Sequence, residues 1–528
     1  MTKTHQAYTL PKNILTLKQK VGQLFMPAVF INDTEDEVRK MEKLIKEHHI
    51  GSICFFHSRA SAATNFEGKK KVAHNAKSYN RLLELIARYQ KAANVPLLVA
   101  IDAEWGLAMR IENTPQYPYA ITLGALTDNN DLIYKVGEAI GKDCRQAGIQ
   151  WNLSPVVDIN NNPENPVIGY RSFGDDRNSV FHKAEAFLKG MAKSGTLNSI
   201  KHFPGHGDTA TDSHLGLPVI DKSLEELMEN ELYPFKKGIE SGVDSVMVGH
   251  LLLPQLDAEN PSTTSSKIIL DLLRKKLGFD GVVISDALNM HAVSKKFPQK
   301  GALEKAAFNA GMDVLCFSEN VAEGIEGILA SASEERIQES FERVWNLKHK
   351  VFSVKTQSND SGLDVNFKLN RKIAAQSITE LYGNAPTVEE IKSSNFLNVS
   401  VNSSKENSFS EQISFNFRSK VVDLDTALNS KEQNVLLSIF PPAVKPKNQF
   451  GFDESTLTTI HKLVEKKNTL IYLFGNPYVL DILKLKPSSN AVLMYQNFPE
   501  FQEVAFEHFS DIIEAKGKLP IQLKTFQP

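Results

Sequence analysis

The stretch FDGVVISDAL, residues 279–288, carries the pattern that decides the fold of this 528-residue chain. It is a short and nearly continuous apolar run, which Gly278 precedes and the carboxylate of Asp286 ends. Such a run is typical of a parallel β-strand that is covered on both faces. Gly278 follows a basic turn, as expected at the C-terminal end of a helix. The stretch therefore predicts a helix followed by a buried strand with an acidic residue at its carboxyl end.

The same kind of run recurs along the first 350 residues, and segments with helical periodicity separate the runs. The other runs are VGQLFMPAVF (21–30), IGSICFFH (50–57), VPLLVAIDAE (95–104), GIQWNLSPVVDIN (148–160), TLNSIKHFPG (196–205), GVDSVMVGHL (242–251) and GMDVLCFSE (311–319). Leu82, Leu83 and Ile86 form one helical stripe, and Ser223 with Glu226 has the spacing of a capping box. Eight strands that alternate with helices predict an α/β protein with a (β/α)₈ TIM-type barrel. A doubly wound sheet is the alternative, although no Gly-rich phosphate-binding turn follows any strand.

A change in composition near residue 353 predicts a second domain. The segment SVKTQSNDSGLDVNFKLN is polar, with several Ser and Asn residues and a Gly, as expected of a linker. Further strand-like runs follow at 396–401, 420–425, 434–440, 469–475 and 491–496. We therefore expect a barrel domain over 1–352, a linker over 353–372 and a smaller α/β sandwich domain over 373–528.

The overall composition excludes several classes of protein. A formal charge of −2 argues against broad electrostatic attraction to nucleic acid or an anionic membrane. The three cysteines lie far apart without CxxC spacing, so neither a zinc ribbon nor a disulfide framework is indicated. No apolar run is long enough for a membrane span, and the first twenty residues lack a signal-peptide core. The expectation is a cytoplasmic protein, with a periplasmic or secreted form left open and the oligomeric state undetermined.

Polar side chains stand at the predicted carboxyl ends of several strands. These residues are Asp102, Asp158, Lys201, His202, His250 and Asp286. In a barrel the carboxyl ends of all strands surround one mouth, where barrel enzymes carry their catalytic groups. A single polar residue at a strand end is usually a cap or a packed side chain, and Asp158 with Arg171 is open to interpretation as a structural ion pair. The convergence of several such ends instead indicates an active site.

The stretch KHFPGHGDTATDSH, residues 201–214, is too rich in glycine to be a helix or a long strand, and three interpretations are open for it. A metal site would use its histidines with Asp208 or Asp212, but their spacing matches no compact zinc motif. An acid–base site would use Asp212 and His214, which are two residues apart and share a side of an extended loop. A polar surface loop is the third interpretation.

Asp286 has two interpretations as well. It could cap the helix that follows the strand, or it could act as a nucleophile, since a carboxylate at the end of a buried strand is costly unless it is satisfied or used. A carboxylate that attacks an anomeric carbon while a second group protonates the leaving oxygen is the arrangement of a retaining glycosidase. Here the second group would be a histidine.

These motifs together resemble glycoside hydrolase family 3, in particular its bacterial β-N-acetylglucosaminidase branch. The resemblance rests on 201–214, on VISDALNM (283–290) and on NNPENPVIGYRSFGDD (161–176), set in an eight-strand pattern. It implies that Asp286 is the nucleophile, His214 the general acid/base and Asp212 the residue that orients it. It also implies a set of sugar-binding residues, which are Asp102, Arg110, Arg171, Lys201 and His202.

The resemblance implies a function with no metal and no cofactor: release of terminal β-linked N-acetylglucosamine from oligosaccharides, such as peptidoglycan fragments. A phosphorylase or a β-glucosidase of the same family is an alternative, as is a metal-dependent barrel hydrolase or a non-catalytic sugar-binding protein. One residue departs from the family pattern. DAEWGLAMR (102–110) has Trp105 where the family usually has a glycine, and a tryptophan adopts glycine-only backbone angles at a cost.

Overall fold

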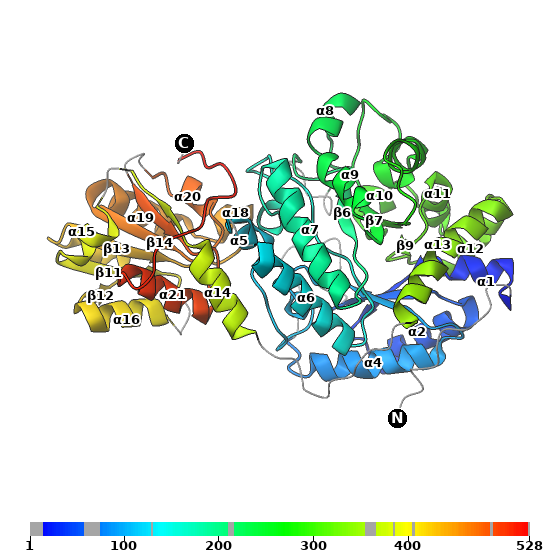
Figure 1. Ribbon diagram of the computed structural model, residues 1–528, viewed down its shortest axis with the longest axis horizontal. Coiled ribbons are helices and arrows are strands. Elements are labelled where there is room, and N and C mark those ends of the chain that lie inside the picture. Colours follow the sequence, from blue (N-terminus) through cyan, green and yellow to red (C-terminus); the bar gives the residue numbers. More distant parts are fainter. Residues whose placement is uncertain are drawn as a thin grey trace. The chain divides into compact units, whose positions relative to one another are not determined.

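The computed structural model describes residues 14–57, 74–127, 130–209, 216–353, 366–383, 386–403, 407–485 and 489–525. The protein has a mixed α/β fold in which nearly all strand pairings are parallel (Figure 1). Its residues divide into two compact units. The first holds 1–116, 133–159 and 184–365, and the second holds 117–132, 160–183 and 366–528.

Every apolar run predicted as a strand in the first 350 residues contains one. The strands are β1 (Phe25–Met26), β2 (Ala28–Phe30), β3 (Ser52–Phe56), β4 (Leu98–Ile101), β5 (Trp151–Asn152), β6 (Ile200–Phe203), β7 (Ser245–Val248), β8 (Val282–Ser285) and β9 (Leu315–Cys316). They pair in parallel in the orders β2-β3-β4-β5, β6-β7-β8 and β1-β9. Isolated parallel bridges join Trp151 to Leu197, Val156 to Lys201 and Ile284 to Val314. All carboxyl ends within a parallel sheet lie along one edge, which places the polar residues that follow these strands together.

Helices alternate with these strands, as the periodicity predicted. They are α1 (Leu17–Gly22), α2 (Glu35–His48), α4 (Ser78–Ala92), η2 (Leu107–Met109), α6 (Asn130–Gln146), α7 (Arg177–Lys193), α8 (Leu224–Glu229), α9 (Tyr233–Glu240), η4 (Ser262–Thr264), η5 (Lys267–Lys276), α10 (His291–Ser294), α11 (Ala302–Ala310), α12 (Val321–Leu329) and α13 (Glu334–Phe352). In α4 the prediction of Leu83 as a core residue was wrong, because Leu83 is exposed. Leu82 and Ile86 are buried as expected, and Leu85 and Tyr89 complete their face.

The predicted signals at helix ends are confirmed. Ser223 and Glu226 form a capping box at α8, since each side chain accepts a hydrogen bond from the other residue's backbone N–H. Gly278 follows η5 with a φ of 70°, in the left-handed region that ends helices. These local signals set where the connections turn back toward the next strand.

Buried ionisable residues stabilise the amino ends of the strands, opposite the carboxyl ends. Asp313, just before β9, accepts hydrogen bonds from the guanidinium groups of Arg274, Arg336 and Arg343 and is fully buried. Lys348 of α13 is also fully buried, and its ammonium donates to the side-chain oxygen of Gln23 at 2.7 Å and to the carbonyl of Pro96 at 2.8 Å. Burial holds the pKa of Lys348 well below its usual value. Polar residues at this end of parallel strands serve stability.

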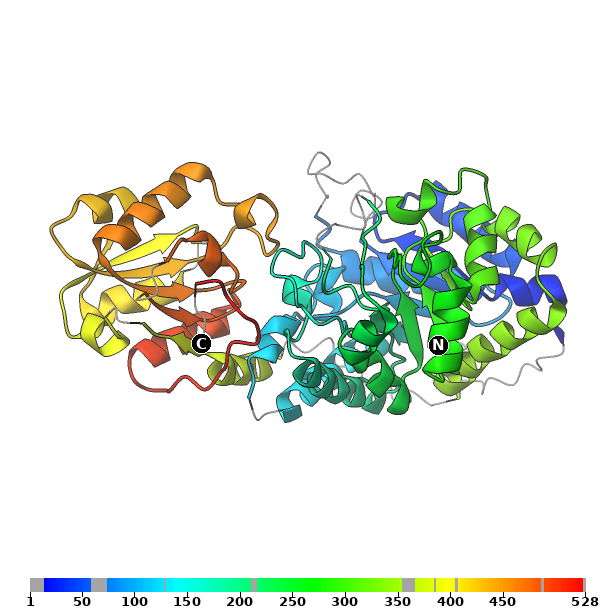
Figure 2. The same ribbon diagram turned by 90° about the horizontal axis from the view of Figure 1, so that it is seen from above.

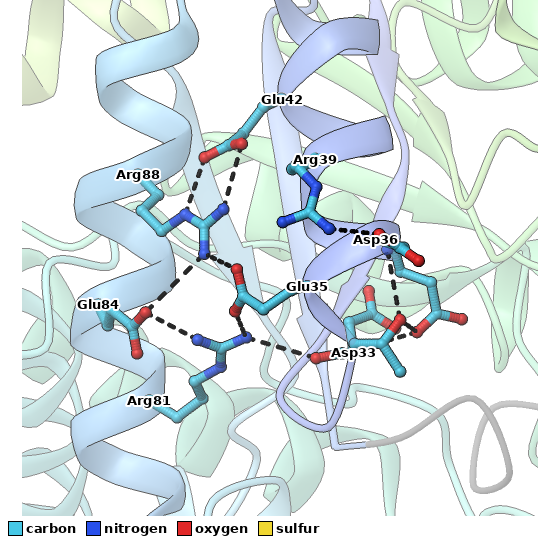
Figure 3. A network of polar contacts seen from close by, with 10 residues as sticks. Asp33, Glu35, Asp36, Arg39, Glu42, Arg81, Glu84 and Arg88 are labelled. Carbon is cyan, nitrogen blue, oxygen red and sulfur yellow. Dashed lines mark hydrogen bonds and ion pairs between the residues drawn. The ribbon is translucent and has the colours of Figure 1, made fainter.

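A network of ion pairs connects the neighbouring helices α2 and α4 on the surface of the first unit (Figure 3). Arg88 binds Glu42 through two nitrogens and also reaches Glu35, while Arg81 binds Glu35 and Glu84. These pairs are half-exposed, and solvent-exposed pairs contribute about 0–1 kcal/mol each. The buried residues Val38 and Ile45 of α2 fix its position more strongly than the charges do.

The second unit contains a six-stranded sheet in the order β10-β15-β14-β13-β11-β12, in which only β10 runs antiparallel to its neighbour among the described residues. Its strands are β10 (Thr379–Leu381), β11 (Phe396–Val401), β12 (Lys420–Val422), β13 (Asn434–Ile439), β14 (Asn468–Leu473) and β15 (Asn490–Leu493). The predicted strand over 420–425 was half wrong. Asp423 caps the helix α17, because its carboxylate accepts the N–H of Thr426, and the strand therefore stops at Val422.

Helices cover both faces of this sheet, and Figure 2 shows α19 and α21 on opposite faces. The helices of the second unit are α5 (Ala120–Gly124), η3 (Gly169–Arg171), α14 (Phe367–Ser377), α15 (Val388–Lys392), α16 (Ser408–Phe417), α17 (Leu424–Asn429), α18 (Lys447–Phe450), α19 (Glu454–Lys466), α20 (Val479–Ile482) and α21 (Pro499–Phe509). Helix α21 packs against α14 and α16, whereas α19 packs against α17. Across the described residues, no helix has the length and apolar character that crossing a bilayer requires.

Candidate active site

The first part of the site is an ionic cluster between the ends of β4 and β6. The ammonium of Lys201, which is 2% exposed, lies 2.7 Å from Oδ1 of Asp102 and 2.8 Å from Oε1 of Glu104. The guanidinium of Arg110 donates to Oδ2 of Asp102 at 3.0 Å. Two cations and two carboxylates therefore share one partly enclosed volume, and their charges cancel.

The electrostatics of this cluster keep Asp102 ionised. Burial alone would raise the pKa of Asp102, but Lys201 and then Arg110 lower it below its usual value. The guanidinium of Arg110 also stacks over the ring of Phe56, with 3.6 Å from its carbon to the ring centroid. Arg110 is thus held on two sides. Fixed charged donors and acceptors of this kind can form charge-assisted hydrogen bonds with the hydroxyl groups of a sugar.

A second group of contacts orients His202. Asp158 follows the end of β5 and is fully buried. Its carboxylate accepts hydrogen bonds from Nδ1 of His202 at 2.7 Å, from the N–H of His202 at 3.1 Å and from the N–H of His206 at 2.7 Å. Burial would raise the pKa of Asp158, and His202 lowers it instead. This carboxylate therefore fixes both the ring of His202 and the backbone turn that follows it.

Asp286 directly follows β8 and is partly exposed at the surface of the first unit. Its N–H donates to the carbonyl of Val248, and its Oδ1 accepts the N–H of Ala287 at 2.7 Å. Burial would raise its pKa, but His250, His202 and the Ala287 N–H lower the pKa to about 2. Asp286 is therefore a carboxylate at neutral pH, as a nucleophile must be. The segment after it does not begin a regular helix until His291, so the alternative of a simple helix cap is not supported.

The loop after Asp102 shows whether Trp105 adopts the backbone angles that favour glycine. Gly106 has a φ of 99°, in the region that favours glycine, whereas Trp105 is not among the residues with a positive φ. The cost of glycine-only backbone angles at a tryptophan therefore does not arise here, because the neighbouring Gly106 makes the turn. Trp105 is only partly buried, beside Glu104.

The remaining predicted residues stand as follows. Asp212 and His214, the predicted acid–base pair, lie outside the described residues. Arg171 belongs to η3 in the second unit, where its guanidinium donates to the carbonyl of Val167 at 3.4 Å. The structure brings Asp158 together with His202, so its interpretation as a structural partner of Arg171 is not needed to satisfy it.

Within the described ranges, no group of three or more His, Cys, Asp or Glu side chains is placed to hold an ion. The metal interpretation also names Asp212 and His214, which lie outside these ranges. His202 and His206 do lie close together, with ring centroids 5.9 Å apart. Their Nδ1 atoms face Asp158 and the hydroxyl of Thr209, respectively, at 2.7 Å each. Burial and then His202 lower the pKa of His206 to about 4, so this ring is neutral at physiological pH.

The sequence alone did not indicate the contacts that two residues of this site make. Glu104 was noticed only as part of a motif, although its position two residues after Asp102 could have indicated a shared side of the strand end. His250 was noted at a strand end, but its contact with the residue after Asp286 depends on the pairing of β7 with β8. The sequence shows which strand ends are polar, whereas the partners follow from strand order.

An ionised, partly exposed carboxylate that follows a strand of a parallel α/β unit is compatible with the nucleophile of a retaining glycoside hydrolase. The comparison with known families agrees. The chain belongs to glycoside hydrolase family 3, since the family described as "Glycosyl hydrolase family 3 N terminal domain" matches residues 16–347.

Individual relatives support the same assignment. The chain is 32% identical over 377 residues to "Beta-hexosaminidase A" of Pseudoalteromonas piscicida, a match that covers 65% of this chain and 61% of that protein. It is 34% identical over 266 residues to "Beta-hexosaminidase" of Tolumonas auensis, which covers 48% of this chain and 78% of the relative. A glycoside hydrolase family 3 β-N-acetylglucosaminidase from Paenibacillus sp. str. FPU-7 superimposes with a TM-score of 0.77 and 30% identity, covering 96% of this chain and 99% of that one.

Proposed function

We propose that this protein is a retaining exo-β-N-acetylglucosaminidase that releases terminal β-linked N-acetylglucosamine, with peptidoglycan fragments as the natural substrate class. The observation that carries the proposal is Asp286, a partly exposed carboxylate whose pKa is lowered by His250, then by His202 and Lys201. Support also comes from relatives that are named β-hexosaminidases and from the similar Paenibacillus β-N-acetylglucosaminidase.

In the first chemical step, a carboxylate oxygen of Asp286 attacks the anomeric carbon of the sugar. The bond between this carbon and the glycosidic oxygen breaks, and the leaving oxygen takes a proton from the imidazolium of His214. The product is a glycosyl ester of Asp286. The low pKa of Asp286 makes the carboxylate available for this attack at neutral pH.

In the second step, water attacks the same carbon and gives its proton to the imidazole of His214, and the carboxylate of Asp286 leaves. Two inversions give retention of configuration. Asp212 would orient His214 and stabilise its charged form, as a carboxylate beside an imidazole does. The scheme needs neither a metal nor a cofactor.

Asp102, Lys201 and Arg110 are proposed to bind the sugar hydroxyls. Each of the three is already fixed by an ion pair, so little side-chain freedom is lost when the sugar binds. His202, held by Asp158, would add a further sugar-binding residue on the first unit. The role of Arg171 in sugar binding stays a prediction from the family resemblance. Binding groups that are ordered beforehand place the anomeric carbon for attack.

We propose a closed (β/α)₈ barrel for the first 352 residues, with 353–372 leading into an α/β sandwich domain over 373–528. The pairing of β1 with β9, the first and last strands of the series, supports closure. The bridges from β5 to Leu197 and from β8 to Val314 are consistent with a continuous ring of parallel strands.

The test is release of 4-nitrophenol from its N-acetyl-β-glucosaminide in the presence of EDTA. We expect activity in the wild type and a loss of at least about 10³-fold in Asp286→Asn, which keeps the shape of the side chain but not its charge. Asp280→Asn is the matched control, since Asp280 is an exposed carboxylate before β8. No release by the wild type, or full release by Asp286→Asn, contradicts the proposal.

The same assay separates the alternatives. Sugar 1-phosphate as the product in phosphate buffer would show a phosphorylase, and preference for the glucoside would show a β-glucosidase. Loss of activity in EDTA that Zn²⁺ restores would show a metal-dependent hydrolase. Each outcome has its own signature, so the result identifies the class.

A further inference from the structure

The carbonyl of Ala287, the residue after Asp286, accepts a hydrogen bond from a buried histidine that the proposed chemical steps do not use. His250 follows β7 and is fully buried. Its Nε2 lies 2.9 Å from the carbonyl oxygen of Ala287, and its Nδ1 lies 2.5 Å from the hydroxyl of Thr263. The ring thus joins the 3₁₀ turn η4 to the turn that carries Asp286.

Hydrogen-bond chemistry determines which nitrogen of His250 carries a proton. A carbonyl oxygen can only accept, so Nε2 must be the donor toward Ala287. In the neutral ring Nδ1 then accepts the hydroxyl proton of Thr263. If the ring is protonated, the hydroxyl can turn to the carbonyl of Gly249, 3.1 Å away. In both protonation states the hydrogen bond to Ala287 is kept.

The peptide that His250 holds is also the one that holds Asp286. The N–H of Ala287 donates to Oδ1 of Asp286 at 2.7 Å, while the carbonyl of the same residue accepts from His250. The N–H of Leu288 donates in turn to the carbonyl of Cys316 on β9. The turn is therefore restrained on both sides, and the Asp286 carboxylate is tied through Oδ1.

We propose that His250 is a positioning residue for Asp286: by clamping the Ala287 peptide it orients the carboxylate and presents its second oxygen to the anomeric carbon. This inference rests on the proposed function, which assigns the attack to Asp286. His250 acts through the peptide and not on the sugar. A misplacement of about 1 Å at a reacting group can cost about 100-fold in rate, so a clamp of this kind affects kcat more than substrate binding.

Electrostatics supports the same placement. Burial would raise the pKa of Asp286, and the largest opposing effect comes from His250, ahead of His202, the Ala287 N–H and Lys201. His250 is thus close enough to stabilise the charged carboxylate as well as to orient it. Among the groups that lower the pKa of Asp286, His250 extends from the end of β7, whereas His202 and Lys201 extend from β6.

The experiment compares His250→Leu with His250→Gln. Leucine removes both hydrogen bonds, whereas the amide of glutamine can still donate to Ala287. With the 4-nitrophenyl substrate we expect kcat to fall about 100-fold in His250→Leu with KM changed less than about threefold. His250→Gln should recover at least about tenfold of that loss. Thr263→Val, which removes only the far contact, should lower kcat by less than His250→Leu does.

His461→Leu is the matched control. Nε2 of His461, on α19 of the second unit, donates to the carbonyl of Ile482 at 3.0 Å, so the same kind of bond is removed without touching Asp286. This variant should keep the wild-type kcat. Thermal unfolding of every variant verifies that the fold is intact. A folded His250→Leu with kcat within about threefold of wild type, or a glutamine variant no faster than the leucine variant, overturns the inference.

A second measurement does not depend on activity and keeps the inference testable if the proposed substrate is wrong. In protein labelled with ¹³C at the aspartate carboxyl carbon, the resonance lost in Asp286→Asn identifies Asp286. We expect it to show an ionised carboxylate in the wild type down to the lowest pH at which the protein is folded, and to titrate at a higher pH in His250→Leu. An unchanged titration would contradict the contact. A wild type without activity contradicts only the proposed function.

Discussion

Replacement of Lys201 by methionine is the sharpest test of how the site holds its charges. One ammonium serves two carboxylates, at 2.7 Å from Asp102 and 2.8 Å from Glu104. With an effective dielectric constant of about 20, each contact corresponds to a gross attraction of about 6 kcal/mol. Desolvation of the buried ions offsets most of it, and the removal of one partner from a buried pair costs about 3–5 kcal/mol in net stability.

The loss should depend on pH, and its sign follows from Asp102. In the wild type Lys201 holds the pKa of Asp102 below its usual value, and without Lys201 the effect of burial raises that pKa. A carboxylate with a raised folded pKa binds its proton more tightly in the folded state, so stability is lost as pH rises through that pKa. Lys201→Met should therefore be destabilised more at pH 7.5 than at pH 5.

Tryptophan fluorescence reports the loss of stability in the first unit, which contains Lys201. The three tryptophans of the chain, Trp105, Trp151 and Trp345, all belong to the first unit. Urea unfolding followed by their emission at pH 5 and pH 7.5 gives the change in unfolding free energy, provided that the transition is two-state.

The control is Lys18→Met. The ammonium of Lys18 contacts Glu326 of α12, but both side chains are more than half exposed, so we expect a change within about 1 kcal/mol. Lys201→Met with the stability of the wild type at both pH values would refute the shared-ammonium description. An equal loss at both pH values would refute the assigned role of Asp102 in the pH dependence.

Three further predictions follow from other buried and exposed charges. Asp158→Asn should lower the unfolding free energy by about 1–3 kcal/mol, because the amide cannot accept all three N–H donors that the carboxylate satisfies. It should also lower kcat. Urea unfolding measures the first change and the 4-nitrophenyl assay the second. Lys348→Met should flatten the pH dependence of stability: a lowered lysine pKa makes stability rise with pH toward 10.5 in the wild type, and the methionine variant, followed by thermal unfolding from pH 7 to 10, should lose that rise. Arg88→Gln should change stability by no more than about 1 kcal/mol in spite of its several ion pairs, since they are half-exposed; a larger shift of the urea midpoint would contradict this.

Most strands of the fold could be predicted because a parallel strand that is covered on both faces has to be apolar throughout its length. Each predicted run up to Cys316 contains a strand, and so do the later runs from Phe396 onward. The strand β10 (Thr379–Leu381) was missed, since three residues with an exposed Glu380 at the edge of a sheet carry no such pattern. The run at 420–425 was assigned as strand throughout because apolar content alone does not show that Asp423 caps a helix.

The candidate site was predicted in part for a related reason. Polar residues that end apolar runs, such as Asp102, Lys201 and Asp286, are visible in the sequence because they interrupt the pattern. Their partners are not visible in this way. Glu104 beside Lys201 and His250 beside Ala287 are contacts between different strand ends, which depend on how neighbouring strands pair.

The amino-acid sequence by itself determined where the strands run and which of them end in a charged group, because burial on two faces and the cost of a buried charge act on each segment separately. The tertiary structure alone decided which charge faces which. Asp158 and His202 are 44 residues apart and Asp102 and Lys201 are 99 apart, and only the parallel packing of their strands brings each pair within 2.7 Å. Coulomb attraction weakens as the charges move apart, so the lowered pKa of Asp286 and the orientation of the rings near it arise only once the chain has folded.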